Sequence, residues 1–542
     1  MGIDYAGNTA KTRSEWCEHS INTNYISTSL DTGVTREYYL ELTDGMFAPD
    51  GVERYSMAIN GSIPGPTLFA DWGDTVVVHV TNSLTSSKNG TSIHFHGIRQ
   101  NYTNQNDGVS SITQCPTPPG SSITYKWKAE QYGTTWYHSH FGLQAWAGAF
   151  GGIVINGPSA ANYDEDLGVL FLNDWSHIPV DTLHTIEQTG ASFELDNGLL
   201  NGTNVYSGGD VVGQTGQRLN LSFTAGTSYR IRLINAAIDT HFKFSIDNHT
   251  LQVIANDLVP IHPYTTNILD IAMGQRYDVI VRADQDDAPN SSFWIRAIPQ
   301  ETCSNNAAPD NIKGVIHYGE SQSTPTSQPY NYTDSCEDEA ATNLKPYFAQ
   351  DVGASTWNKT QSLYGWFNDE GLFRWYLNSS TMVVDWENPT LLQTYNNNTN
   401  FLTSKNLIEL PEANKWAYIV IQSLMDGPHP IHLHGHDFLV LGQGYGTFNN
   451  NITLNLHNPP RRDTAMLLSS GYLVIAFETD NPGAWLMHCH VGWHTSEGFA
   501  LQFLERAQDL APLIDAERLE SNCAAWNDYQ TANAVVQDDS GV

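Results

Sequence analysis

The most informative residues of the chain are His488, Cys489 and His490, with His494 five residues after the cysteine. A thiolate with imidazoles suits copper, and one Cys with two His is the ligand set of a blue-copper electron-transfer site. A second imidazole for such a site is available upstream, at His429. Because successive side chains of a strand point to opposite faces, His488 and His490 turn away from Cys489. We therefore expect a second metal site beside the first.

Histidines at alternate positions occur far more often than composition predicts. With 20 His in 542 residues, random placement gives roughly 0.7 such pairs. The pairs present are His94–His96, His138–His140, His432–His434, His434–His436 and His488–His490. The two members of a pair share one face of a strand, so a pair can bridge two adjacent metal ions. A lone pair is often structural, but four pairs, one around a cysteine, favour a three-copper cluster held by eight imidazoles.

The order and context of these motifs resemble those of the multicopper oxidases. The matching segments are His94–Gly97, Trp136–His140, His429–His436 and His488–Phe499. The likeness covers essentially the whole chain and is greatest to the ascomycete-type laccases, because of the stretch Asn458–Thr464 and the final residues Asp539–Val542. The resemblance implies a laccase, which couples four one-electron oxidations of phenols or aromatic amines to the reduction of O₂ to two H₂O.

The resemblance also implies four copper ions, one of type 1, one of type 2 and two of type 3. It assigns the type 1 copper to His429, Cys489 and His494. It assigns the type 2 copper to His94 and His432. It assigns one type 3 copper to His96, His138 and His490, and the other to His140, His434 and His488. His436 lies outside this pattern, and we expect it to be structural.

The neighbours of Cys489 in the chain suggest an electron route. An electron that enters through His494 and crosses Cys489 has a short bonded path to His488 and His490. At the axial position of the type 1 copper the resemblance places Phe499, where ascomycete-type laccases usually have Leu and bilirubin oxidases have Met. A side chain that cannot ligate destabilises Cu(II) relative to Cu(I), so we expect a raised reduction potential.

Two acidic residues are candidates for proton transfer. Asp107 lies thirteen residues after His94, where the resemblance implies a carboxylate that helps to deliver protons to oxygen; the alternative is an ordinary turn residue. Asp239 matches the position of a carboxylate at the mouth of the electron-accepting site of related laccases. There it would accept the phenol proton as His494 takes the electron, and the alternative is a solvated loop acid.

The polar end of the chain, Asp539–Val542, has two interpretations. The resemblance implies that the terminal carboxylate enters the channel to the cluster, towards which copper cations attract it. The alternative is a frayed terminus.

The six cysteines indicate an oxidising environment. Cys489 belongs to the copper site, and the resemblance implies the disulfides Cys115–Cys523 and Cys303–Cys336. Cys17 is then left over, and it is either free or paired between molecules.

Composition excludes several classes of partner. A net charge of −33, from 58 acids and 25 bases, argues against nucleic acid and against an anionic membrane surface. No apolar run approaches the roughly 20 residues of a membrane span, and the absence of an apolar leader at Met1 predicts a mature form. Sequons for N-linked glycans begin at Asn60, Asn89, Asn101, Asn201, Asn220, Asn248, Asn290, Asn331, Asn358, Asn378, Asn397 and Asn451. We expect a secreted, extracellular, monomeric glycoprotein.

Short β-branched or alternating stretches bounded by Gly, Pro, Asn and Asp predict an all-β protein. The length suggests about three domains, and the resemblance implies three cupredoxin-like Greek-key β-sandwiches. We place them at residues 1–157, 158–340 and 341–542. The middle one has no His-x-His pair, so we expect it to hold no copper and to form a wall of the substrate pocket. The cluster would then lie between the first and third domains.

Two other functions are alternatives to that of a laccase. Another multicopper oxidase is the main alternative: Phe499 argues against a bilirubin oxidase, and the lack of a membrane anchor argues weakly against a ferroxidase. A copper-binding protein without catalysis is disfavoured, because all ten histidines and Cys489 of the expected sites are present.

Overall fold

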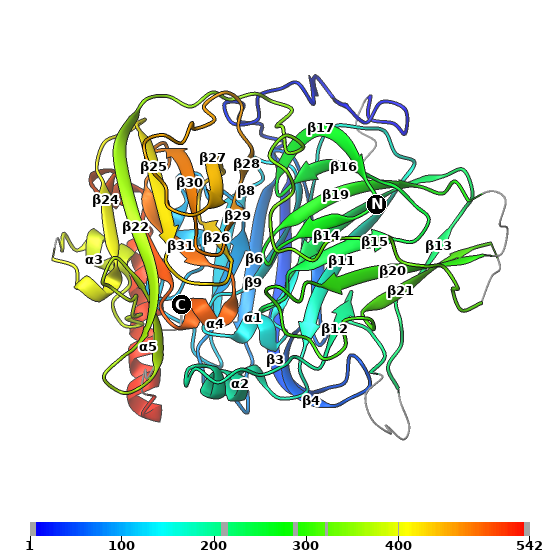
Figure 1. Ribbon diagram of the computed structural model, residues 1–542. Coiled ribbons are helices and arrows are strands. Elements are labelled where there is room, and N and C mark those ends of the chain that lie inside the picture. Colours follow the sequence, from blue (N-terminus) through cyan, green and yellow to red (C-terminus); the bar gives the residue numbers. More distant parts are fainter. Residues whose placement is uncertain (1–6, 207–214, 286–290, 320–322, 399, 536–542) are drawn as a thin grey trace.

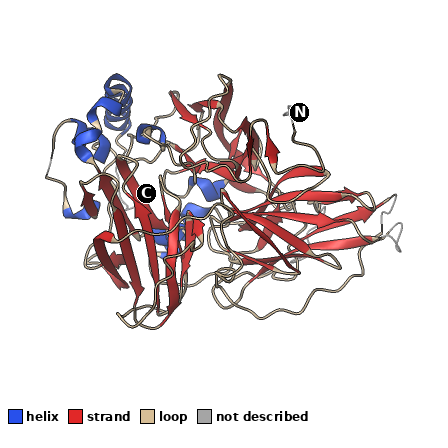
Figure 2. Cartoon of the chain, turned by 90° about the horizontal axis from the view of Figure 1, so that it is seen from above, coloured by secondary structure: helices blue, strands red, loops and turns tan. Residues whose placement is uncertain are grey.

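The computed structural model describes residues 7–206, 215–285, 291–319, 323–398 and 400–535. Its large sheets group into three units along the chain. In Figure 1 the blue and cyan strands of the first unit lie in the centre, the green second unit on the right, and the yellow and orange third unit on the left. Seen from above, most helical segments gather at one side of the strands (Figure 2).

The first unit contains two four-stranded sheets that share a core. One sheet runs in the order β4 (Arg54–Ile59), β3 (Thr35–Phe47), β6 (Thr75–Asn82) and β8 (Ser122–Lys128). The other runs β5 (Gly65–Asp71), β10 (Phe150–Asn156), β9 (Gly133–Ser139) and β7 (Ile93–His96). Along β6, Val76, Val78 and Val80 are buried and alternate with half-buried residues, which is the pattern of a strand with one face on the core. A two-stranded hairpin, β1 (Glu15–Trp16) and β2 (His19–Ser20), precedes them.

The second unit contains a six-stranded and a five-stranded sheet. The larger runs β12 (Asn197–Leu200), β11 (Glu165–Trp175), β14 (Ser228–Asn235), β19 (Arg276–Arg282), β16 (Leu251–Asn256) and β17 (Val259–Thr266). The smaller runs β13 (Asn220–Phe223), β21 (Lys313–Tyr318), β20 (Ser292–Pro299), β15 (Phe242–Ile246) and β18 (Leu269–Ile271).

The third unit repeats this arrangement. Its larger sheet runs β23 (Phe373–Leu377), β22 (Ser355–Phe367), β25 (Trp416–Ser423), β30 (Gly471–Glu478), β27 (Phe438–Tyr445) and β28 (Arg461–Arg462). Its smaller sheet runs β24 (Leu407–Leu410), β32 (Ala500–Glu505), β31 (Gly483–Cys489), β26 (His429–Leu433) and β29 (Thr464–Leu467). The predicted boundaries at 157/158 and 340/341 fall between β10 and β11 and between β21 and β22, and they stay predictions. The all-β class is confirmed.

Helices are few and short, with one exception. They are α1 (Gln144–Ala147), α2 (Val180–Glu187), α3 (Thr390–Tyr395), α4 (Gly492–Ser496) and α5 (Ala516–Asn533). The longest helix, α5, was not predicted from the sequence. The helix begins where the Asp515 side chain accepts a hydrogen bond from Arg518 N, a standard N-cap, and it buries Leu519, Cys523 and Trp526. No helix within the described residues combines the length and apolarity needed to cross a membrane.

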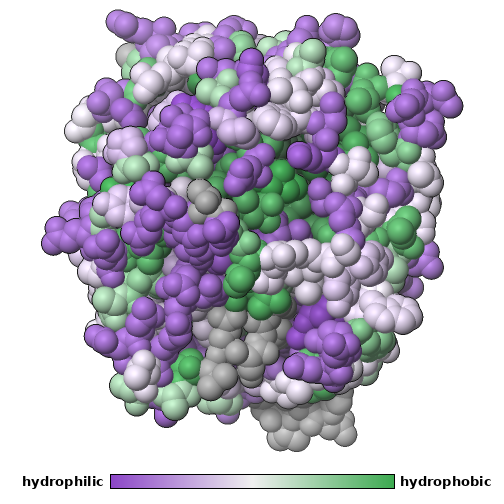
Figure 3. Space-filling view, turned by 90° about the vertical axis from the view of Figure 1, so that its left-hand side faces the viewer, coloured by the Kyte–Doolittle hydropathy of each residue, from purple (hydrophilic) through white to green (hydrophobic). Residues whose placement is uncertain are grey.

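Both predicted disulfides are confirmed. Cys115–Cys523 ties the first unit to α5, and Cys303–Cys336 joins the second unit to the segment that follows it. Cys17 is exposed and forms no disulfide with another described residue. On the face shown in Figure 3, hydrophilic residues predominate and hydrophobic residues form smaller patches between them.

Candidate metal centre

Two pairs of neighbouring strands carry the histidine motifs to one place. In the first unit β7 and β9 are antiparallel, and their register sets His94 opposite His138. In the third unit β26 and β31 are antiparallel, and their register sets His432 opposite His488 and Ile431 opposite Cys489. Each unit therefore aligns two motifs across a single strand pair, where opposed side chains lie close together.

Cys489 meets two imidazoles at the end of β31. Its Sγ lies 3.5 Å from His494 Nδ1 and 3.8 Å from His429 Nδ1. The two Nδ1 atoms are 3.1 Å apart. One sulfur and two imidazole nitrogens that converge in this way form a ligand set suited to copper.

Aromatic rings close the space around these three residues. The ring of Phe499, which is buried, lies 5.1 Å from the ring of His429. The ring of Trp375 lies 4.6 Å from that of His494 and 4.9 Å from that of His429. Neither aromatic side chain offers a metal ligand, so the two rings only exclude water and other donors.

The eight other motif histidines gather between the strand pairs of the first and third units, and all are buried. Nitrogens within 4.8 Å of one another form the groups His94, His96, His138; His94, His432, His434; and His140, His434, His488. The ring of His490 lies 5.1 Å from that of His96 and 5.9 Å from that of His138. The structure thus brings together all eight cluster residues named from the sequence, in one group.

Asp107 accepts hydrogen bonds from one imidazole of the first unit and one of the third unit. It is fully buried; its backbone carbonyl lies 2.8 Å from His94 Nδ1, and its Oδ2 lies 2.9 Å from His434 Nδ1. Asp107 therefore fixes the orientation of both rings, as acceptors beside metal-binding histidines commonly do. The following Gly108 is required, because a Cβ there would collide with the carbonyl oxygen of Ile93.

Asp463 holds a second pair of imidazoles in the same way. Its carbonyl lies 2.8 Å from His432 Nδ1, and its Oδ1 lies 3.1 Å from His96 Nε2. Arg276 of the second unit donates to both oxygens of this carboxylate, at 2.6 and 2.5 Å. Gly274, at φ +82°, lets the same segment approach the ring of His490, and a Cβ there would lie 2.8 Å from His490 Cδ2. The second unit contributes no motif histidine, yet it forms a wall of the cluster.

The nitrogens not held by the protein face one another without partners. The buried imidazole nitrogens that find no hydrogen-bond partner within the described part of the chain include His94 Nε2, His96 Nδ1, His138 Nε2, His432 Nε2 and both nitrogens of His140 and His490. Buried polar atoms are almost always paired, because leaving them unpaired costs free energy. Metal ions would supply the missing partners, so the donor set fits the copper ions that the motifs predict.

Burial also sets the protonation of these groups. It lowers the pKa of His429 to about 3 and that of His488 to about 4, and it lowers the pKa of His494 well below its usual range. The imidazoles stay neutral, which is the form that binds a metal. Burial raises the pKa of the Cys489 thiol well above its usual value, an effect that a bound cation opposes.

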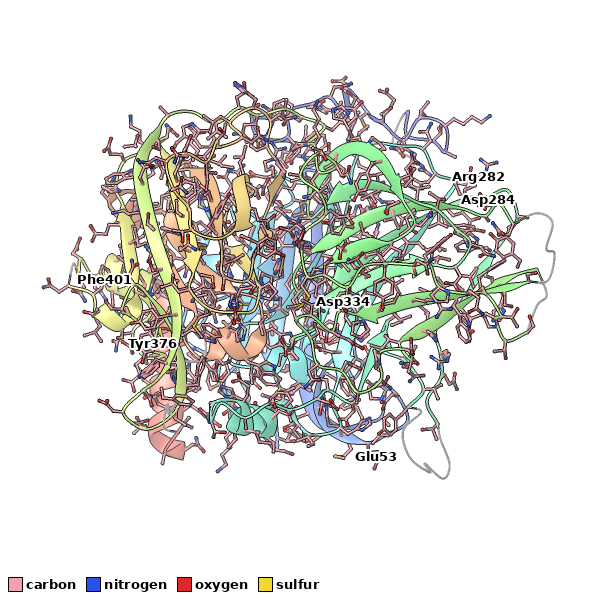
Figure 4. The ribbon with its side chains drawn as sticks, in the orientation of Figure 1. Glu53, Arg282, Asp284, Asp334, Tyr376 and Phe401 are labelled. Atoms are coloured by element: carbon pink, nitrogen blue, oxygen red, sulfur yellow. A yellow bond between two sulfur atoms is a disulfide. The ribbon has the colours of Figure 1, made fainter. Side chains whose placement is uncertain are left out.

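A cavity of about 370 Å³ opens at His494, which is half-buried while His429 is buried. Its walls include Asp239, Glu187 and the aromatic rings of Phe193, Phe373, Trp375 and Trp493. Figure 4 shows Tyr376, whose strand β23 also carries Phe373 and Trp375. Burial raises the pKa of Asp239 well above its usual range, and the negative charges of Asp174 and Glu187 add to this. We call His429, Cys489 and His494 the sulfur site. The structure therefore places Asp239 in the same cavity as His494, the partly exposed imidazole of that site.

Other residues from the sequence analysis lie elsewhere. His436 is not in the cluster: its Nε2 lies 3.0 Å from Glu505 Oε2, and its Nδ1 lies 3.1 Å from the carbonyl of His434. The terminal segment Asp539–Val542 lies outside the described residues, so its insertion into a channel stays a prediction.

Sequence reasoning missed several residues of the centre. Asp463 belongs to the stretch Asn458–Thr464 that carried the resemblance, but its neighbours in the chain gave no signal that it reaches His96. Trp375 and Glu187 had no signal, because both are far in sequence from any motif and meet His494 only through folding.

Multicopper oxidase family models match residues 41–160, 166–321 and 376–509 of the chain. Laccase-2 of Botryotinia fuckeliana is 47% identical over 550 residues, covering 99% of this chain and 93% of that one. The crystal structure of the laccase from Botrytis aclada is 46% identical with a TM-score of 0.94 and covers 99% of both chains.

A more distant solved structure shares the same fold. Fet3p, described as a multicopper oxidase that functions in iron import, is 26% identical with a TM-score of 0.79, covering 94% of this chain and 97% of that one. The predicted fold of three cupredoxin-like sandwiches is confirmed by these matches. The chain therefore belongs to the multicopper oxidase family, among its ascomycete-type laccases.

Proposed function

We propose that the protein catalyses four one-electron oxidations of phenols or aromatic amines and couples them to the reduction of O₂ to two H₂O. For phenols, four ArOH lose four electrons and four protons as ArO• radicals, and O₂ takes up the same four electrons and four protons. The observation that carries the proposal is His494: it opens on an aromatic cavity and lies next to Cys489, whose chain neighbours His488 and His490 belong to the cluster.

We assign four copper ions to the two sites. His429, Cys489 and His494 would hold the type 1 ion, and the buried ring of Phe499, which cannot act as a ligand, lies beside them. His94 and His432 would hold the type 2 ion. The type 3 ions would be held by His96, His138 and His490, and by His140, His434 and His488. The short nitrogen and sulfur separations support two of these sets, His429 with Cys489 and His494, and His140 with His434 and His488. The division of the other histidines rests on the family resemblance.

When bound, the copper ions supply reversible one-electron chemistry and the place where O₂ is reduced. The protein supplies the rest. Trp375 and Phe499 keep water from the sulfur site. Of the three residues of that site, His494 is the one that lines the substrate cavity. The carboxylate of Asp239 accepts the phenol proton, for which its raised pKa makes it a better base.

Asp107 would act at the other end of the reaction. Its carboxylate is buried between His94 and His434, where a proton held on it lies next to the space in which O₂ reacts. Its first task is to orient the two rings, and its second is to pass protons inward.

The setting of the enzyme follows from its composition. We propose a secreted, extracellular monomer that carries N-linked glycans. The sequons and the two disulfides support secretion.

Oxygen uptake with three donors tests the activity. We expect rapid uptake with a methoxyphenol and slow uptake with Fe(II) and with bilirubin. Elemental analysis should return four copper ions per chain. Faster uptake with Fe(II) than with the phenol would indicate a ferroxidase, and loaded protein without uptake on any donor would indicate a copper carrier.

A further inference from the structure

The cavity at His494 combines two chemical features that concern its choice of substrate. Four of its wall residues are aromatic: Phe193, Phe373, Trp375 and Trp493. Two others are acidic, Asp239 and Glu187, and among the described residues no lysine or arginine lines it. An aromatic chamber with acid groups and no basic group attracts cations, because ring faces and carboxylates both present negative charge.

Glu187 is the part of this cavity that the proposed reaction does not use. It is the last residue of α2, a position where a helix presents its own partial negative charge and where an acid gains nothing in stability. Its Oε2 is buried and finds no hydrogen-bond partner among the residues that the structure describes. A carboxylate oxygen left in this state costs free energy, which suggests that something other than folding retains it.

The two carboxylates act on the same space. The charge of Glu187 is among the causes that raise the pKa of Asp239, so the two groups are electrostatically close. The backbone of Asp239 is fixed by a hydrogen bond, because its N–H donates to Asp174 Oδ2 at 2.9 Å. Glu187 approaches from α2, which lies below α4 in Figure 1, so a bound ring would meet acids from two separate elements.

We propose that this cavity selects aromatic electron donors that carry a cationic amino group over anionic aromatic donors, and that Glu187 is the residue that determines this preference. The inference rests on the proposed function and narrows its substrate class. A protonated aromatic amine meets the ring faces and an acid at once. A phenolic carboxylate or sulfonate meets two acids and no counter-charge.

The four rings favour an organic cation over a metal cation. A small hydrated ion such as Fe(II) prefers oxygen ligands and gains little from indole and phenyl walls. A ring with an ammonium group uses both the walls and the acids, so an aromatic cation fits the whole lining.

Binding of redox-inert probes to the copper-loaded full chain tests the inference without relying on turnover. The probes are phenyltrimethylammonium and benzenesulfonate, measured by calorimetry and as competitive inhibitors of methoxyphenol oxidation. We expect the cation to bind at least about tenfold more tightly than the anion, as a single partly desolvated charge contact allows. In Glu187→Gln this ratio should fall about fivefold or more, and Glu187→Lys should reverse it.

Matched controls separate the charge of Glu187 from general effects. Glu194→Gln makes the same change at an exposed acid that does not line the cavity, and it should leave the ratio unchanged. Because the charge of Glu187 helps to raise the pKa of Asp239, the kcat/KM for the neutral methoxyphenol should fall in Glu187→Gln, whereas the ratio of probe affinities involves no proton transfer and decides the inference.

Several results would overturn the inference. Equal affinity for cation and anion in the unaltered enzyme would do so, as would an unchanged ratio in Glu187→Gln. A variant that alters Fe(II) oxidation but not phenyltrimethylammonium affinity would show that Glu187 serves a metal cation instead. If the neutral methoxyphenol drives no oxygen uptake at all, the proposed function fails, and the probe affinities still decide the charge preference of the cavity.

Discussion

The sulfur site and the histidine cluster are built in different ways from the same kinds of residue. The sulfur site takes His429, Cys489 and His494 from the third unit alone, has aromatic walls, and leaves one imidazole half-buried. The cluster takes histidines from two units, buries all of them, and orients them with carboxylates from Asp107 and Asp463. The sulfur site is thus open to an electron donor outside the protein. The histidine cluster is buried, and such a donor cannot reach it.

This difference has a consequence for stability as well as for chemistry. The sulfur site depends on neighbouring elements of one unit, so local packing assembles it. The cluster exists only when the first and third units dock, and the second unit secures it through Arg276 and Gly274. Contacts between units should therefore affect the cluster far more than the sulfur site.

The largest effect should come from Cys489→Ser. We expect the copper content to fall by one ion per chain and methoxyphenol oxidation to fall to the background rate, because a hydroxyl is a poor substitute for a thiolate ligand. Elemental analysis and oxygen uptake measure both. Cys17→Ser, which changes an exposed thiol, is the matched control and should alter neither. A Cys489→Ser enzyme that keeps its full copper content would contradict the role of Cys489 as a copper ligand.

Asp107→Ala should damage the cluster and spare the sulfur site. Loss of the carboxylate beside His94 and His434 is expected to lower oxygen turnover about 10- to 100-fold, as for other residues that orient metal-binding histidines. Anaerobic reduction of the sulfur site by a phenol should keep its rate. Asp107→Asn retains an acceptor for His434 Nδ1 but cannot take up a proton, so this variant separates ring orientation from proton delivery. A higher copper content than in Asp107→Ala, with turnover still low, would support both roles of Asp107.

Gly274→Ala tests whether the second unit matters to the cluster. A side chain at φ +82° that presses on His490 should cost about 1–3 kcal/mol. We expect a lower Tm and an altered cluster spectrum with an unchanged sulfur-site spectrum. Gly226→Ala, at φ +85° with open space around its Cβ position, reproduces the backbone strain without the contact. Equal changes in both variants would mean that strain alone, rather than the approach to His490, is responsible.

The smallest effect should come from Phe499→Met, which changes the sulfur site alone. A thioether at the axial position stabilises Cu(II) and should lower the reduction potential measured by redox titration. Copper content and the cluster spectrum should stay the same. An unchanged potential would show that Phe499 does not control it.

Much of the fold was predictable, because strands with one buried face carry an alternating pattern such as that of β6. The helix α5 was missed, although Leu519, Cys523 and Trp526 are spaced by four and three residues, as on one face of a helix. That signal is weak because most of α5 is polar and its apolar face is narrow. Its position is decided by the disulfide to Cys115 and by packing on segments distant in the chain.

The motif histidines and Cys489 were identifiable from the sequence because strand geometry fixes their spacing. The carboxylates that orient them were only partly identifiable. Asp107 was found through the resemblance, whereas Asp463 reaches His96 across 367 residues, and no local pattern encodes such a contact. Glu187 belongs to α2, where its charge has no visible purpose until α4 and β23 are placed around it.

The sequence by itself determined the ligand chemistry, because residue type and alternation in a strand decide which atoms can meet a metal and on which face. Only the tertiary structure decided which imidazole is open to a substrate, which carboxylates hold the rings, and which charges line the cavity. Those properties depend on distances between segments hundreds of residues apart, and such distances are set by the docking of whole units.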